Sequence, residues 1–132
     1  MLKLFSLDEA NNLIPTLEGF LGDLQLGIKD TLRLRQELST MNPHSLEARN
    51  TVQELNFLLR QINDSRGQLD KMGIFLKDLE SGQIDLPSQL GAEVVYLTYE
   101  KGKLLITHYH HLNEGTTLPL PVSEQKLVQL LS

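Results

Sequence analysis

The sequence of 132 residues contains no cysteine, which excludes disulfides, thiolate metal sites and cysteine nucleophiles. It also lacks a basic segment, because 17 Asp and Glu face 12 Lys and Arg and the formal net charge is −5. Proteins that bind nucleic acid or an anionic membrane surface need clustered positive charge. We therefore expect no nucleic acid and no membrane among the partners.

Long apolar runs are missing as well. Leu2, Leu4 and Phe5 are too few to form the apolar region of a signal peptide, and charges interrupt the later runs. We therefore expect a cytoplasmic protein. The length is close to the commonest domain size, so a single domain over residues 1–132 is expected.

Side chains that are apolar, or tolerated at a helix contact, recur at alternating steps of three and four residues over 6–40, which predicts one long helix with a heptad seam. The seam consists of Leu7, Ala10, Ile14, Leu17, Leu21, Leu24, Ile28, Thr31, Arg35 and Leu38. Ser6 and Glu9 have the spacing of a capping box, so the helix should begin at Leu7. Pro15 lies inside the pattern, removes one backbone hydrogen bond and predicts a kink rather than an end.

A second seam follows a break at 41–44 and ends before Gly73, which suits a left-handed helix cap. Its members are Ala48, Val52, Leu55, Leu59, Ile62, Arg66 and Leu69. Two helices of similar length joined by a short turn predict an antiparallel hairpin within residues 1–72. Arg35 and Arg66 stand at seam positions, where their stems could cover apolar surface or their heads could pair with acids of another subunit.

Further apolar residues lie outside both seams and widen the apolar surface of the hairpin. They are Leu13, Phe20, Leu26, Leu32, Leu34, Phe57 and Leu58. One stripe between two helices cannot bury them all, so the C-terminal half or a second copy must cover them. We predict a homodimer or another self-associated form, with Leu13, Phe20, Phe57 and Leu58 at the interface; an unknown protein partner is also open.

From Gly73 onwards the pattern alternates between apolar and polar residues. Four short strands are expected, at 74–77, 83–86, 93–99 and 103–111, with a turn at 78–82. Pro87 should end the second strand, and the last two strands should pair as an antiparallel hairpin. An irregular tail is expected at 113–122, which contains Pro119 and Pro121, followed by a short helix from Ser123 through Leu131.

These elements together predict an α+β fold. A long, coiled-coil-like antiparallel helical hairpin (1–72) should pack against a small antiparallel sheet (73–112), with the irregular tail and short helix at 113–132.

Three features occur in a fixed order: SLDEAN at 6–11 followed by LIP at 13–15, a long helical pair, and KDLESGQIDLP at 77–87. The last segment is the most specific, because two Asp, a Gly and a Pro occupy set positions. In this order the features resemble a family known only as domain of unknown function 2203 (DUF2203), over roughly residues 4–115. The resemblance implies this fold and no established activity.

His108 and His110 are the clearest chemical feature. Residues two apart on a strand point to the same face, so both imidazoles could bind one divalent metal ion, with Glu114 as a further ligand. A metal-dependent enzyme or metal sensor is therefore the alternative function. The other interpretation is that the imidazoles lie in solvent or form hydrogen bonds to neighbouring carboxylates.

Asp78 and Asp85 could form a carboxylate pair for acid–base chemistry if the turn brings them together. Alternatively, each could accept hydrogen bonds from backbone amides near a turn. No Gly-rich phosphate loop or Ser-His-Asp order accompanies them. We therefore expect a non-catalytic interaction or scaffold module without a cofactor, with Asp78, Asp85, His108 and His110 as candidate functional residues.

Overall fold

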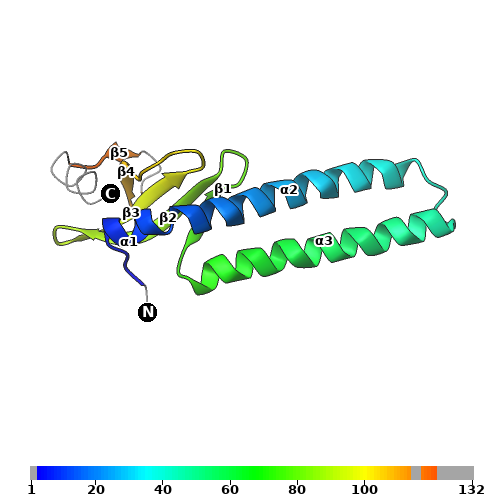
Figure 1. Cartoon of the computed structure of the whole chain (residues 1–132), viewed down its shortest axis with the longest axis horizontal. Coiled ribbons are helices and arrows are strands. Elements are labelled where there is room, and N and C mark those ends of the chain that lie inside the picture. Colours follow the sequence, from blue (N-terminus) through cyan, green and yellow to red (C-terminus); the bar gives the residue numbers. More distant parts are fainter. Residues whose placement is uncertain (1–2, 114–116, 122–132) are drawn as a thin grey trace.

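The computed structural model describes residues 3–113 and 117–121 of the chain. Two long helices, α2 (Ile14–Ser39) and α3 (Leu46–Lys71), form a hairpin that projects from one end of a small antiparallel sheet (Figure 1). The predicted α+β fold is confirmed. The short helix expected from Ser123 and the candidate ligand Glu114 lie outside the described residues.

The N-terminal helical region is divided in two at the proline. Helix α1 (Leu7–Asn12) begins with the predicted capping box, in which the Ser6 hydroxyl accepts from the amide of Glu9 and the Glu9 carboxylate accepts from the amide of Ser6. Leu13 then separates α1 from α2. The prediction of one helix with a kink was wrong here, because Pro15 has no amide to continue the hydrogen-bond ladder across this point.

Helix α3 ends before Gly73, as the sequence predicts, and begins at a serine cap that was not predicted. The Ser45 side chain accepts from the amide of Ala48 at its start. After its last residue, Gly73 adopts a φ of +79° and the amide of Ile74 donates back to the carbonyl of Leu69. This left-handed turn redirects the chain from the hairpin into the sheet.

The contact between α2 and α3 is rotated away from the predicted seam near the hairpin turn. Leu34 and Thr51 are buried, whereas the adjacent seam residues Arg35 and Val52 are exposed. A shift of one residue turns a helix by about 100°. Because the helices are antiparallel, the same shift on both leaves one flank of the hairpin uncovered.

A glycine allows the two helices to approach closely on the other flank. A Cβ atom at Gly27 would lie 3.0 Å from Cγ1 of Ile62 on α3. That distance is shorter than carbon–carbon contacts at optimal separation, about 3.5–4.0 Å. The missing side chain at Gly27 therefore permits the observed packing.

The sheet contains five antiparallel strands in sequence order. They are β1 (Phe75–Asp78), β2 (Gln83–Leu90), β3 (Glu93–Glu100), β4 (His108–His111) and β5 (Leu118–Pro119). The prediction that Pro87 ends the second strand was wrong. The carbonyl of Pro87 accepts from the amide of Phe5, so its missing N–H lies on the side away from β3 and β2 continues.

The last part of the sheet also differs from the prediction. Strand β4 begins at His108 rather than at residue 103, because the chain leaves the sheet to bury Ile106, whose amide donates to Oδ1 of Asn11. The tail expected to be irregular contributes β5, and the amide of Leu120 donates to the carbonyl of Thr107. The region 101–107 is therefore a loop outside the sheet.

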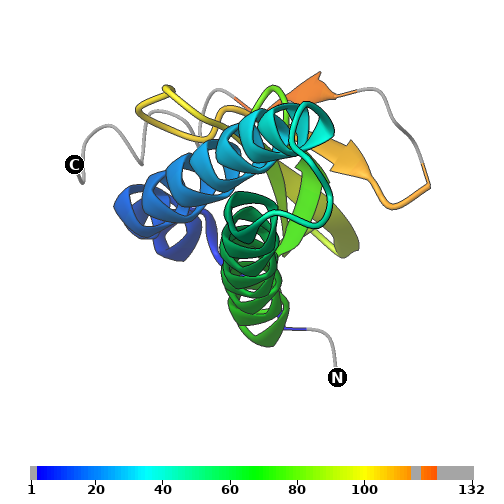
Figure 2. The same ribbon diagram turned by 90° about the vertical axis from the view of Figure 1, so that its right-hand side faces the viewer.

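The core lies between one face of the sheet and the near end of the helices (Figure 2). Leu13 and Phe20, predicted at an interface, are partly buried against this core. Phe57 is exposed and Leu58 is half-buried. No helix within the described ranges is long and apolar enough to cross a membrane.

Candidate functional site

The face of the sheet that points away from the core, here called the outer face, carries a buried Asp–His pair. Oδ2 of Asp85 on β2 lies 2.9 Å from Nε2 of His110 on β4. Strand β3 lies between them, with Thr98 opposite Asp85 and Tyr96 opposite His110. The hydroxyl of Thr98 donates to Oδ1 of Asp85 at 3.1 Å, so both carboxylate oxygens are engaged.

Both ring nitrogens of His110 face oxygen atoms of the protein. Nδ1 lies 2.9 Å from the carbonyl of His111, which can only accept, so Nδ1 carries a proton. Nε2 lies against the carboxyl group of Asp85, so both ring nitrogens are engaged within the protein. The side chains of His110 and Asp85 are 7% and 11% exposed. In this arrangement His110 has no nitrogen left for a substrate or a ligand.

Aromatic rings cover the pair. The ring of Tyr96 lies 5.2 Å from that of His110, and Phe75 packs edge-on against Tyr96 at 5.9 Å. These rings and the low exposure of both side chains keep water away from the contact, which strengthens a hydrogen bond between its two polar groups. The pair therefore clamps β2 to β4 across the outer face.

Asp78 does not join this arrangement. Its carboxylate accepts from the amide of Glu80 at 3.1 Å and from the hydroxyl of Ser81 at 2.7 Å, in the turn between β1 and β2. In the β1–β2 register Asp78 lies opposite Gln83 and Asp85 lies opposite Phe75. The two carboxylates therefore occupy different positions of the ladder, and Asp78 stabilises a turn.

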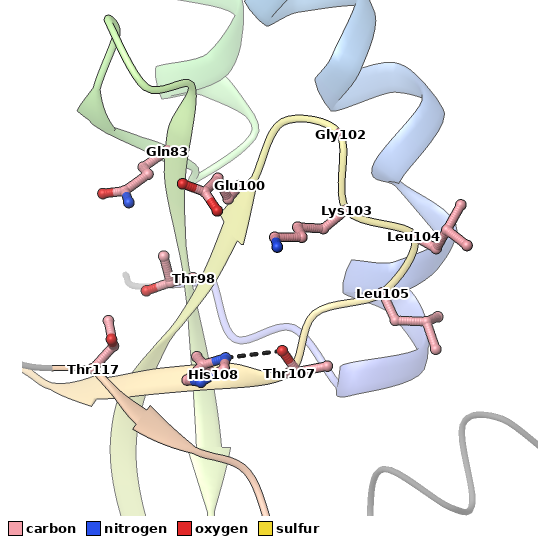
Figure 3. Close-up of a pocket in the computed structure, with 10 residues that line it drawn as sticks. All are labelled: Gln83, Thr98, Glu100, Gly102, Lys103, Leu104, Leu105, Thr107, His108 and Thr117. Carbon is pink, nitrogen blue, oxygen red and sulfur yellow. Dashed lines mark hydrogen bonds between the residues drawn. The ribbon is translucent and has the colours of Figure 1, made fainter.

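His108 lines a pocket on the outer face (Figure 3), together with Thr98, whose hydroxyl donates to Asp85. The pocket, here called the sheet-face pocket, has a volume of about 600 Å³. It is lined by Gln83, Thr98, Glu100, Gly102, Lys103, Leu104, Leu105, Thr107, His108 and Thr117. Nδ1 of His108 lies 2.8 Å from the hydroxyl of Thr107, and Nε2 has no hydrogen-bond partner among the described residues.

One wall of this pocket is the loop 101–107, and the helices hold it in place. Three hydrogen bonds join the loop to α1 and α2: the amide of Ile106 donates to Asn11 (2.8 Å), the amide of Gly102 to Glu18 (3.3 Å), and Nζ of Lys101 to Gln25 (2.9 Å). Side chains of α1 and α2 therefore hold in place a loop that follows them by about eighty residues in the sequence.

Glu18 also accepts a hydrogen bond from the hydroxyl of Tyr99 at 2.8 Å. Tyr99 is fully buried beneath the loop. Burial and this bond raise the pKa of the Tyr99 phenol to about 12, because both favour its neutral form. The phenol therefore remains a hydrogen-bond donor at neutral pH.

The pocket residues Gln83, Thr98, Glu100 and Lys103 were missed by sequence reasoning. Three of them occupy alternate positions of β2 and β3, a pattern that marks only a sheet face. Among the described residues no group of three or more His, Asp or Glu is arranged to hold a metal ion. The structure thus places His108 in one pocket with Thr98, Glu100 and Lys103, whereas His110 pairs with Asp85 outside that lining.

A family model described as an uncharacterized conserved protein (DUF2203) matches residues 3–118. This match confirms the resemblance read from the motifs at 6–15 and 77–87. No curated protein and no solved structure matches the chain.

Proposed function

The chain belongs to the uncharacterized conserved protein family DUF2203, and we propose that it is a cytoplasmic, non-catalytic interaction and scaffold module that self-associates through its helical hairpin. One observation carries the proposal: four aliphatic side chains share the uncovered flank of the hairpin. They are Ile28 and Leu32 on α2 and Val52 and Leu59 on α3, here called the aliphatic flank.

The aliphatic flank is exposed although three of its residues belong to the predicted seams. Ile28, Leu32 and Val52 are 37%, 61% and 42% exposed, and Leu59 is half-buried. Ile28 and Leu32 are one helical turn apart, and Val52 and Leu59 are two turns apart, so each pair lies along one line. Apolar side chains gathered in this way mark a surface for another protein.

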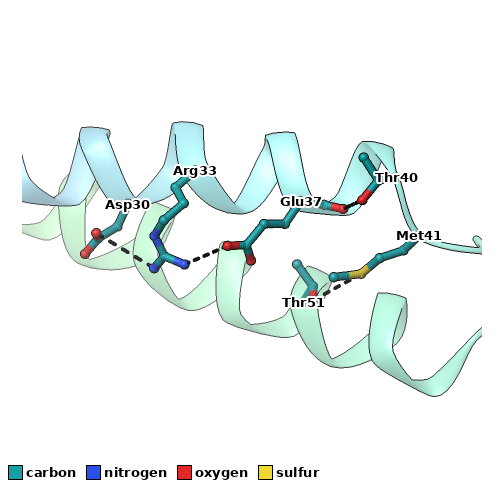
Figure 4. A network of polar contacts seen from close by, with 6 residues as sticks. All are labelled: Asp30, Arg33, Glu37, Thr40, Met41 and Thr51. Carbon is teal, nitrogen blue, oxygen red and sulfur yellow. Dashed lines mark hydrogen bonds and ion pairs between the residues drawn. The ribbon is translucent and has the colours of Figure 1, made fainter.

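The opposite flank of α2 is polar and already engaged. Arg33 lies 3.1 Å from Glu37 and 3.9 Å from Asp30, and all three lie along one line of the helix (Figure 4). At about 100° per residue, this line is on the far side of α2 from Ile28 and Leu32. The hairpin therefore has an aliphatic flank and an opposite flank with ion pairs, here called the polar flank, on which Leu26 is also exposed.

A second copy of the chain is the occupant that suits the aliphatic flank best. Each arm has 26 residues and is about 39 Å long, and both arms contribute two aliphatic residues. A two-fold axis would place the same side chains against each other and give a four-helix layer. Arg35 and Arg66 border the flank and have no acidic partner in the described part of the chain, so acids of a second copy can pair with them.

The non-catalytic part of the proposal is supported by the outer face. Asp85 and His110 are the residues best suited to acid–base chemistry, and each is committed to the other and to backbone or hydroxyl groups. A general base needs a free lone pair within reach of its substrate.

Light scattering of matched variants tests the proposal. Leu32→Lys combined with Val52→Lys should convert the protein to a monomer with unchanged helix content, because lysine in an apolar contact must be desolvated. Leu26→Lys is the control, since Leu26 is 58% exposed on the polar flank. Equal masses for wild type and the double variant would contradict the proposal.

A further inference from the structure

The sheet-face pocket contains two opposite charges that do not pair with each other. Glu100 and Lys103 both line it, and the amide of Lys103 donates to the carbonyl of Glu100 at 3.1 Å. Their side chains form no ion pair, and neither has a side-chain partner within the described part of the chain. A carboxylate and an ammonium group are therefore both available in one cavity (Figure 3).

The pocket is held rigid around these charges. Its floor includes Thr98, whose hydroxyl donates to Asp85 in the buried pair. Its wall is the loop 101–107, which Asn11, Glu18 and Gln25 fix to the helices. A ligand entering such a site would have to order the side chains of Glu100 and Lys103 but not the backbone of the wall, which limits the free energy lost to ordering the protein.

Three further lining side chains carry hydrogen-bonding groups. The amide of Gln83, the free lone pairs of the Thr98 hydroxyl, and Nε2 of His108 all belong to this cavity. A volume of about 600 Å³ is typical of sites for small molecules. One cation opposed by one anion does not suit a polyphosphate, which requires an excess of positive charge.

We propose that the sheet-face pocket binds a small zwitterion that carries one ammonium and one carboxylate group, as a free α-amino acid does. Glu100 accepts from the ammonium group, and Lys103 donates to the carboxylate. Thr98, Gln83 and His108 complete the hydrogen bonds. No residue of the aliphatic flank lines this pocket.

The test is a titration of the full-length protein with each of the twenty common amino acids, followed by backbone amide NMR shifts. At least one of them should give saturable shifts at Thr98, Gly102 and His108. The N-acetyl and methyl ester derivatives of that amino acid should each bind at least about tenfold more weakly, because each lacks one charge. Glu100→Gln and Lys103→Gln should weaken binding of the free amino acid by a similar factor.

Lys77→Gln is the matched control, because Lys77 is an exposed lysine on β1 that does not line the pocket. It should bind as tightly as wild type. Absence of saturable shifts for all twenty amino acids would overturn the proposal. So would equal binding of the capped derivatives, or wild-type affinity in both pocket variants while their amide spectra show an intact fold.

Discussion

Asp85 and His110 lie on strands that are not neighbours, yet their side chains meet at 2.9 Å across the strand between them. The contact is diagonal, because Asp85 is level with Thr98 and His110 with Tyr96. It holds the two strands on either side of β3 together and supports the floor of the sheet-face pocket through Thr98. Loss of this pair should therefore affect the stability of the whole sheet.

Replacing Asp85 by Asn should lower the free energy of unfolding by about 3 kcal/mol, because it removes one partner of a buried pair and leaves His110 without its anion. Urea denaturation measures the change. Glu93→Gln is the control, since Glu93 pairs with His111 at 2.7 Å in an exposed position and should contribute about 1 kcal/mol or less. Equal losses for the two variants would show that the buried pair is not a principal contact.

Tyr99 should make the free energy of unfolding depend on pH in the alkaline range. Its pKa rises from 10.0 to about 12 on folding, so the folded state holds the phenolic proton more tightly than the unfolded state. The contribution of the protonated Tyr99 phenol to the free energy of unfolding is therefore fully present below pH 10 and is lost as the pH rises towards 12. Unfolding measured across this range should show a steeper loss in wild type than in Tyr99→Phe, and parallel curves would contradict the assignment.

Two glycines of α2 should respond to alanine in different ways. Gly19 has no neighbouring atom within 4 Å of an added Cβ, so Gly19→Ala should raise the free energy of unfolding by about 1 kcal/mol. At Gly27 the added Cβ would meet Ile62 at 3.0 Å, and the helices would have to separate. Gly27→Ala should therefore raise the free energy of unfolding by less than Gly19→Ala does, or should lower it. Equal thermal shifts would mean that the helices are not in close contact there.

We expect no stoichiometric transition metal in protein purified without an affinity tag. Both ring nitrogens of His110 are engaged, and His108 is held by Thr107. Elemental analysis measures the metal content directly. A stoichiometric ion that disappears in His110→Ala would instead favour the metal-dependent alternative with His108, His110 and Glu114 as ligands.

Local patterns predicted the elements of this fold well. The spacing of Ser6 and Glu9 predicted the capping box, Gly73 predicted the end of α3, and heptad spacing predicted both arms of the hairpin. Each of these signals depends on residues within one or two helical turns. The interpretation that a histidine bonds to a neighbouring carboxylate was also correct for His110, although its partner Asp85 was not identified.

Features that depend on contacts between distant elements were not predictable in the same way. Asp85 meets His110 only because the β2–β3 register and the β3–β4 register place them opposite nearby residues of β3. Strand β2 continues through Pro87 because the missing N–H of the proline lies on the side of Phe5, more than eighty positions earlier, and not on the side of β3. Val52 is exposed because the contact between α2 and α3 is rotated near the hairpin turn, which depends on how the two helices pack together. No periodicity in the sequence encodes these pairings.

Sedimentation equilibrium of the wild-type protein at tens of micromolar tests the central claim, self-association through the aliphatic flank, most directly. We expect a mass of twice 14.9 kDa, because a second copy must cover Ile28, Leu32, Val52 and Leu59. A single species of 14.9 kDa at this concentration would contradict it.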